Sequence, residues 1–193
     1  AKYGAVDCII NNAGILQPFV KVNDIGFPLI EKIINVDFYG VLYLTKAFLP
    51  HLLQRPEGHI VNVSSMGGLL PVPGESIYGA AKSAVILLTE GLRSELRNTN
   101  VNLTLILPGA MATDIKFNSG ADAKPFTKED LDGAVIKPIA ANIAAEMITQ
   151  GIEKNKNRVL IGKDMKIMYV LNKVLPKLAR HLLNTQMKAH LLD

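Results

Sequence analysis

The two residues whose types and spacing best suit acid–base chemistry are Tyr78 and Lys82, in the segment SIYGAAKSAV at 76–85. Residues four apart on an α-helix are neighbours on one face, about 6 Å apart along the axis. An ammonium that close favours the phenolate and lowers the pKa of the phenol. The pair alone is also common on solvated helix surfaces, so its interpretation as a general acid/base depends on its companions.

Those companions follow the ends of apolar segments. Ser65 lies thirteen residues before Tyr78, at the end of the segment HIVNVSS. Asn12, Ala13 and Gly14 follow the apolar run VDCII, and Pro108 and Gly109 end the run VNLTLILPG, with Met111 and Thr113 shortly after. Asn35 interrupts a long apolar helical pattern, where asparagine is a mediocre helix former. The carboxyl ends of parallel strands meet at one sheet edge, where ligands bind.

The elements that must position these residues alternate along the chain. Buried-type strands are predicted at 5–14 (ending in a turn), 59–65, 101–109 and 158–162, and long helices at 28–54, 76–98 and 137–154. Strands that are apolar on both faces and alternate with helices indicate a parallel sheet covered by helices. Residues 163–193 are predicted to form a basic, amphipathic, helical tail with a kink at Pro176.

Composition indicates a soluble globular chain, with 49% hydrophobic and 20% charged residues. The single cysteine, Cys8, excludes a disulfide within the chain and favours a reducing, cytoplasmic compartment. We expect Cys8 to be a small buried hydrophobe. The four histidines lack metal-ligand spacing, so no metal site is expected.

Charge is unevenly distributed. Residues 151–193 hold nine Lys and Arg against three Asp and Glu, a net charge of +6, whereas residues 1–150 hold twelve against fourteen, a net charge of −2. We interpret the basic tail as the solvated face of a packed helix, with contact to an acidic lipid surface as the weaker alternative. No nucleic-acid partner is expected, and no apolar run reaches the length of a membrane span.

Taken together, the motifs resemble those of the short-chain dehydrogenase/reductase family, in its shorter, single-domain branch. The matching segments are NNAG at 11–14, NV at 35–36, IVNVSSMGG at 60–68, YGAAK at 78–82 and PGAMAT at 108–113. They occur in the family's order and at its usual separations, and they cover the chain nearly to residue 162. The resemblance implies an α/β fold with a doubly wound, Rossmann-type parallel sheet.

The resemblance also implies roles for the residues that match. Tyr78 would be the general acid/base, Lys82 would lower its pKa and hold the nicotinamide ribose, Ser65 would bind the substrate oxygen, and Asn35 would hold a water that relays protons to Lys82. The small residues at 79–81 would let neighbouring groups approach closely. The residues expected to lie along NAD or NADP are Asn12, Ala13, Gly14, Tyr78, Lys82, Pro108, Gly109, Met111 and Thr113. Asn11 and Ser64 are interpreted as structural hydrogen-bonding residues.

One family feature is missing from the sequence. No glycine-rich cofactor loop of the type T-G-x-x-x-G-x-G is present. We therefore expect residues 1–162 to be the C-terminal part of the family's domain, with four of its seven strands and roughly 70–90 residues fewer. On this interpretation activity requires the missing segment, the choice between NAD and NADP cannot be made, and VDCIINN lies at an open sheet edge.

The resulting expectation is an NAD(P)-dependent oxidoreductase that interconverts an alcohol and a ketone or aldehyde. The alternative is a non-catalytic binding or assembly protein that keeps the fold. Four apolar candidates for the pocket lining, Met66, Leu69, Leu70 and Val72, favour a hydrophobic substrate. A homodimer or homotetramer is expected through the helices at 28–54 and 76–98, with Phe38, Leu42, Phe48 and a stripe ending at Leu96 as its apolar face. The tail could add to that interface or close over the substrate.

Overall fold

The centre of the molecule is a four-stranded parallel sheet in the order β1-β2-β3-β6. The computed structural model describes residues 4–121, 127 and 137–187. The strands are β1 (Cys8–Asn11), β2 (Gly58–Val63), β3 (Val101–Pro108) and β6 (Arg158–Ile161). Val61 of β2 is in register with Ile10 on one side and Thr104 on the other. All four predicted strands are therefore confirmed, each within a few residues.

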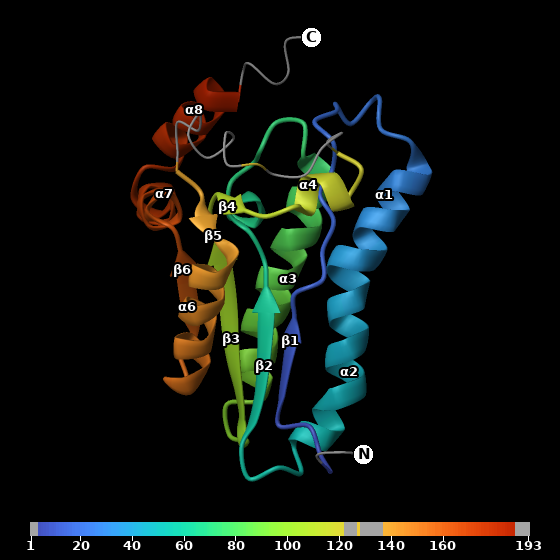
Figure 1. Ribbon diagram of the computed structural model, residues 1–193, viewed down its shortest axis with the longest axis vertical. Helices are drawn as coiled ribbons and strands as arrows, with labels where there is room; N and C mark the ends of the chain where they lie inside the picture. The colour runs from blue at the N-terminus through green and yellow to red at the C-terminus, as the bar shows by residue number, and fades with distance from the viewer. Residues whose placement is uncertain (1–3, 122–126, 128–136, 188–193) are drawn as a thin grey trace.

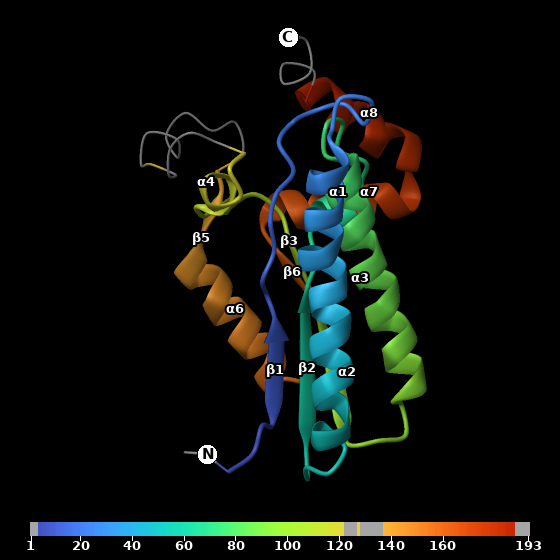
Figure 2. The ribbon, with the colours of Figure 1, turned by 90° about the vertical axis from the view of Figure 1, so that its right-hand side faces the viewer.

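Helices cover both faces of this sheet (Figures 1 and 2). One face carries α1 (Phe27–Ile34), the π-helical turn η1 (Asn35–Tyr39), α2 (Gly40–Leu52) and α3 (Ser76–Glu95), and the other carries α6 (Ala141–Glu153). The predicted α/β, doubly wound architecture is confirmed. The strands run upward in Figure 1, so their carboxyl ends meet at the top.

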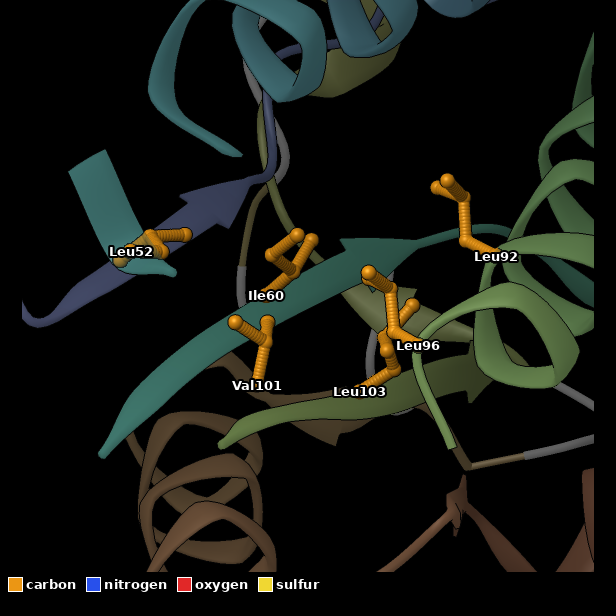
Figure 3. Close-up of a cluster of buried hydrophobic side chains, with 6 residues drawn as sticks. All are labelled: Leu52, Ile60, Leu92, Leu96, Val101 and Leu103. Carbon is orange, nitrogen blue, oxygen red and sulfur yellow. The ribbon is translucent and has the colours of Figure 1, made fainter. Parts of the chain in front are cut away.

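Two cores, one on each face, explain why β2 is apolar along its whole length. Successive side chains of a strand point to opposite faces. Ile60 packs with residues of α2, α3 and β3 in the cluster of Figure 3, which contains Leu52, Ile60, Leu92, Leu96, Val101 and Leu103. Its neighbour Val61 packs on the opposite face with Ile106 of β3 and Ala144 of α6.

Several predicted element bounds were wrong. The helix expected at 28–54 is interrupted by the π-helical turn η1, and α3 ends at Glu95 rather than at 98. The third helix begins at 141 rather than 137 because Ile139–Ala140 form a short strand, β5, that pairs with β4 (Met111–Ala112). Neither short strand was predicted, whereas the one-turn helix α4 (Ile115–Asn118) lies in a polar connection where weak helical stretches were expected.

The tail forms two helices, α7 (Lys163–Val174) and α8 (Pro176–Met187). Leu175 lies between them with non-helical backbone angles, because a residue that precedes proline disfavours the helical region. The predicted break at Pro176 is confirmed. Leu70 packs against Ala179 and Leu183 of α8, so the tail covers the segment that follows β2. Residues 188–193 of the predicted tail lie outside the described residues.

The edge strand β1 differs from the other strands in its exposure. Among the described residues it pairs with β2 alone, as the sequence led us to expect. Ile10 is 52% exposed, and Cys8 is exposed as well. The expectation that Cys8 is buried was wrong, because the sheet continues on only one side of this strand. Within the described part of the chain, no helix is both long and apolar enough to span a membrane.

Candidate active site

Tyr78 lies in the first turn of α3, and a residue distant in sequence holds that turn in place. The backbone N–H groups of Ile77 and Tyr78 donate to Oε1 of Gln17, at 2.9 and 3.2 Å. Nε2 of the same buried amide donates to the Gly74 carbonyl at 2.7 Å. The first N–H groups of a helix lack partners within the helix, and the side chain of the N-cap residue Glu75 makes no capping bond. Gln17 therefore fixes the start of the helix that carries Tyr78.

Lys82 is buried one turn further along α3 and forms an ion pair with Asp37. Its Nζ lies 2.9 Å from Oδ1 of Asp37, and the two side chains are 4% and 0% exposed. The same ammonium donates to the Val63 carbonyl at 3.4 Å and lies 5.7 Å from the centre of the Tyr78 ring. The face shared by Tyr78 and Lys82 was predicted correctly, whereas the carboxylate that meets them was not.

Asp37 occupies the place that we had assigned to Asn35. Asn35 is exposed, and Asp37, two residues later in η1, is buried. The buried positions of this long helical segment recur every four residues, at Ile33, Asp37, Val41 and Thr45. Positions two apart on a helix face different directions, so Asn35 points away from Lys82. Asn35 therefore does not meet Lys82 in this structure, and its expected role in holding a water stays a prediction.

The turn that carries Ser65 lies directly against α3. Ser65 is half-buried and begins the short helix η2 (Met66–Gly68), where its hydroxyl accepts from the Gly67 N–H at 3.1 Å. A Cβ on Gly68 would lie 2.8 Å from the backbone of Lys82, and one on Gly79 would lie 2.9 Å from the Gly67 carbonyl. Glycine at both positions allows this contact and brings Ser65 to Tyr78. Of the small residues at 79–81, Gly79 thus serves the approach of η2.

Ser64 and Asn11 have the structural roles that we expected of them. The buried hydroxyl of Ser64 donates to the Lys82 carbonyl at 2.8 Å. The amide of Asn11 donates to Asn62 Oδ1 at 2.7 Å and to Thr45 Oγ1 at 3.2 Å. Both side chains are satisfied by the protein itself.

The electrostatics around Tyr78 differ from the sequence-based expectation. Burial raises the pKa of the Tyr78 phenol, a hydrogen bond with Ser65 lowers it, and the nearby carboxylates of Asp37 and Glu75 raise it further. The expectation that Lys82 lowers this pKa was wrong for the chain as it stands, since burial and the carboxylate paired with that ammonium raise the pKa. Burial raises the pKa of Asp37 as well, while Lys82 and the Ile15 N–H act against that rise.

Gly14, in the segment that follows β1, lies directly against the ion pair of Asp37 and Lys82. A Cβ on Gly14 would lie 2.7 Å from Oδ1 of Asp37 and 3.0 Å from Nζ of Lys82. The next residue, Ile15, donates its N–H to both carboxylate oxygens at 3.3 Å. Asn12 and Ala13, just before, are exposed beyond the end of β1. This segment therefore touches the Lys82 side of the site.

The segment after β3 contributes residues from a second direction. Pro108, Gly109, Met111 and Thr113 are all half-buried. Met111 packs in the same cluster as Val63, whose carbonyl accepts from Lys82. Asp164 of α7 accepts from the Ala110 N–H at 2.7 Å and ties this segment to the tail.

Three residues of the site were missed from the sequence. Gln17 gave no signal, because its partners are about sixty positions away. Asp37 could have been found because it is an acidic residue in a series of otherwise uncharged positions spaced four apart along a helix. Glu75 is buried beside Tyr78, and burial raises its pKa to about 7, with Lys116 acting in the opposite direction.

Two hollows of the described surface lie away from these residues. One of about 250 Å³ is lined by Asp7, Glu57, Gly58, His59, Ile152, Glu153 and Asn155, near the amino ends of the strands. The other, of about 340 Å³, lies between α2 and α3 and is lined mainly by leucines.

Comparison with known proteins gives a consistent result. The family model for short chain dehydrogenases matches residues 1–124. SadH of Mycobacterium tuberculosis, described as an oxidoreductase, is 40% identical over 182 residues, which are 91% of this chain and 64% of SadH. Dehydrogenase/reductase SDR family member 7B of Mus musculus is 33% identical over 160 residues, 82% of this chain and 49% of that protein. The chain thus spans less than two thirds of these relatives.

Solved structures show the same relationship. A short-chain dehydrogenase/reductase of Burkholderia phymatum in complex with NAD superposes with a TM-score of 0.77 at 25% identity, over 92% of this chain and 69% of that one. A short-chain dehydrogenase of Sphingobium yanoikuyae in complex with NADPH gives 0.69 at 27% identity, over 80% and 56% of the two chains.

Proposed function

The chain belongs to the short-chain dehydrogenase/reductase family, and on that premise we propose that the protein is an NAD(P)-dependent oxidoreductase. It interconverts an alcohol and its ketone or aldehyde, with Tyr78 as the general acid/base. The observation that carries this proposal is the packing of the turn that begins at Ser65 on the first turn of α3. A Cβ on Gly67 would lie 3.5 Å from the Tyr78 ring, and the Lys82 ammonium lies 5.7 Å from the centre of that ring. The hydroxyls of Ser65 and Tyr78 can then both form a hydrogen bond with one substrate oxygen.

The residues present fit the nicotinamide half of the cofactor. An ammonium has three N–H donors, and Asp37 and Val63 accept two of those of Lys82. The third can donate to a ribose hydroxyl from beneath Gly14. Asn12, Ala13 and Gly14 on one side and Pro108, Gly109, Met111 and Thr113 on the other would border that half. When bound, the nicotinamide supplies or accepts the hydride.

The remaining chemistry is a proton transfer by this chain's own side chains. In carbonyl reduction the Tyr78 hydroxyl donates its proton to the substrate oxygen, which Ser65 holds by a second hydrogen bond. In alcohol oxidation the phenolate accepts that proton. The raised pKa of Tyr78 favours the protonated phenol, the form needed for reduction. Lys82 orients the ribose, and its charge, partly compensated by the Asp37 carboxylate, stabilises the phenolate. We propose that Asp37, not Asn35, is the polar group that contacts Lys82 on the side away from the cofactor.

The substrate is proposed to be hydrophobic. Met66, Leu69 and Val72 are half-buried in the segment that follows Ser65, whereas Leu70 packs beneath α8 and is not available to a ligand. Leu70 is therefore removed from the predicted pocket lining.

The test is the Tyr78→Phe variant of the full-length protein. We expect kcat to fall about 10²–10⁴-fold with hydrophobic secondary alcohols and NAD⁺ or NADP⁺, while the thermal melting curve stays close to that of the parent. Turnover equal to that of the parent would refute the role of Tyr78. A parent that turns over no alcohol or ketone with either cofactor would favour the non-catalytic alternative.

We also propose a homo-oligomer through α2 and α3. The exposed apolar residues of this face are Tyr43 and Leu44 of α2, Leu87 of α3, and Tyr39 and Leu53 next to the two ends of α2, beside the leucine-lined hollow. Phe38, Leu42 and Phe48, expected from the sequence to form this face, are half-buried, and Leu96 is buried. Leu87→Lys should shift the light-scattering mass from a dimer or tetramer toward the monomer, and a monomeric parent would contradict the proposal.

A further inference from the structure

The outer side of α7 and α8 combines exposed apolar side chains with exposed cations. Six large apolar residues of this region are between 42% and 69% exposed: Ile167, Val170, Val174, Leu175, Leu178 and Leu182. We call them the tail face. Such a group of apolar side chains on one pair of helices is costly in water and is typical of an interaction surface.

The spacing of these residues places them in stripes. Ile167, Val170 and Val174 are three and four residues apart on α7, which puts them on one side of the helix. Leu178 and Leu182 are four apart on α8. Met165 on α7 is buried against the domain, and so are Ala179 and Leu183 on α8, each one position after a residue of the tail face. The tail face therefore lies opposite the buried side of α7 and beside the buried side of α8.

Cations accompany the tail face. Lys163, Lys166, Lys173, Lys177 and Arg180 are all exposed. Asp164 is the single acidic residue of 163–187, and its carboxylate is turned inward to the Ala110 N–H. Figures 1 and 2 both place α8 at the end of the molecule toward which the strands point, on its outside.

The combination of apolar and basic groups selects the kind of partner. A second copy docked on the same face would bring like charges together, which is destabilising. Nucleic acid would use the cations and leave the apolar stripes in water. A bilayer with anionic headgroups accepts both, because apolar side chains enter the boundary of headgroups and acyl chains while lysines remain among the headgroups.

We propose that the tail face docks on the surface of an anionic lipid bilayer. The helices lie in the plane of the interface, with Ile167, Val170 and Val174 inserted and Lys163, Lys166 and Lys177 among the headgroups. This proposal is independent of the catalytic assignment, because vesicle binding is measured without turnover.

The experiment is co-sedimentation of the full-length protein with vesicles. One set contains phosphatidylcholine alone, and the other contains phosphatidylserine at roughly a third of the lipid. We expect at least about tenfold stronger binding to the anionic vesicles, weakened by salt as the Debye length shortens. No binding to the anionic vesicles would overturn the proposal.

Matched variants locate the surface. Lys163→Glu/Lys166→Glu/Lys177→Glu should lower binding more than about tenfold, since each basic residue near the surface contributes about a factor of five. The control Lys32→Glu/Lys154→Glu/Lys156→Glu changes the net charge equally at exposed sites outside the tail and should bind far better. Equal losses in the two variants would show that only net charge matters and would overturn the proposed surface.

The apolar stripe needs its own variant. Ile167→Ser/Val170→Ser/Val174→Ser should lower vesicle binding at least about tenfold, whereas Ile143→Ser, at an exposed position of α6, should not. Circular dichroism melts check that all variants fold. If the stripe variant binds vesicles normally but sediments as a smaller oligomer, the tail face is a contact between copies, and the proposal is wrong.

Discussion

Two buried polar clusters lie between the same strands and the same helix layer, and they differ in charge. The neutral one joins Asn11, Thr45, Asn62 and Thr89, from β1, α2, β2 and α3. It ends on the backbone, where Thr89 Oγ1 donates to the Val85 carbonyl at 2.7 Å. The charged one joins Asp37 and Lys82, from η1 and α3, at the carboxyl edge of the sheet.

The difference in charge indicates different roles, a structural one for the neutral cluster and a functional one for the charged cluster. In the neutral cluster the side chains bond to one another and to the backbone, which is how proteins satisfy buried polar groups. In the charged cluster two ionisable groups are buried beside two reactive hydroxyls, an arrangement that stabilises a fold poorly unless both partners are present. We therefore expect mutations in the charged cluster to affect turnover and those in the neutral cluster to affect stability alone.

The largest effect is expected from Lys82→Met. Turnover should fall at least about 10²-fold, and the unfolding free energy by about 3–5 kcal/mol, because the Asp37 carboxylate is left buried without its cation. The double variant Lys82→Met/Asp37→Leu should regain stability in urea unfolding but not turnover. Recovery of turnover in that variant would show that Lys82 has only a structural role.

Glu75→Gln tests a buried carboxyl that forms no ion pair with any of the residues the structure describes. The pKa of Glu75 is raised from 4.5 to about 7 in the folded chain. Folding thus favours the protonated form of Glu75. The contribution of this form to the unfolding free energy is fully present below the unfolded pKa and is lost as the pH rises through about 7. Between about pH 5 and pH 8 the parent should lose on the order of 2–3 kcal/mol more stability than the variant. Parallel stability curves from denaturant unfolding would contradict this.

Asn62→Ala breaks the neutral cluster. It leaves the Asn11 amide without its acceptor at 2.7 Å and Thr89 without its donor, at a cost of about 1–3 kcal/mol. The kcat of the folded enzyme should not change, measured at a temperature well below its melting point. A loss of turnover without a loss of stability would erase the distinction between the two clusters.

Asp37→Asn is expected to change the pH dependence of turnover, in addition to removing the stability that the buried ion pair contributes. The variant removes a carboxylate that raises the pKa of Tyr78 and leaves the Lys82 ammonium without its counter-charge. The Tyr78 pKa should fall, so alcohol oxidation should set in at lower pH than in the parent. Asn35→Ala, at an exposed position, is the control, and its pH profile should match the parent's. A shift in the control instead would restore Asn35 as the residue behind Lys82.

Local patterns were sufficient for much of the fold. The apolar runs of β2 and β3 predicted strands buried on both faces, and the residue before Pro176 predicted the break between α7 and α8. The short pair β4–β5 could not be predicted, because its two strands are about thirty positions apart and each has only two residues.

The sequence by itself determined that Tyr78 and Lys82 share a helix face and that Ser65 lies just beyond the carboxyl end of the neighbouring strand, since both follow from helical and strand periodicity. Only the tertiary structure decided what surrounds them. Gln17 reaches the start of α3, Asp37 rather than Asn35 meets Lys82, and the Tyr78 pKa rises instead of falling. The physical reason is that burial and the sign of neighbouring charges depend on contacts between distant segments, which spacing along one helix does not contain.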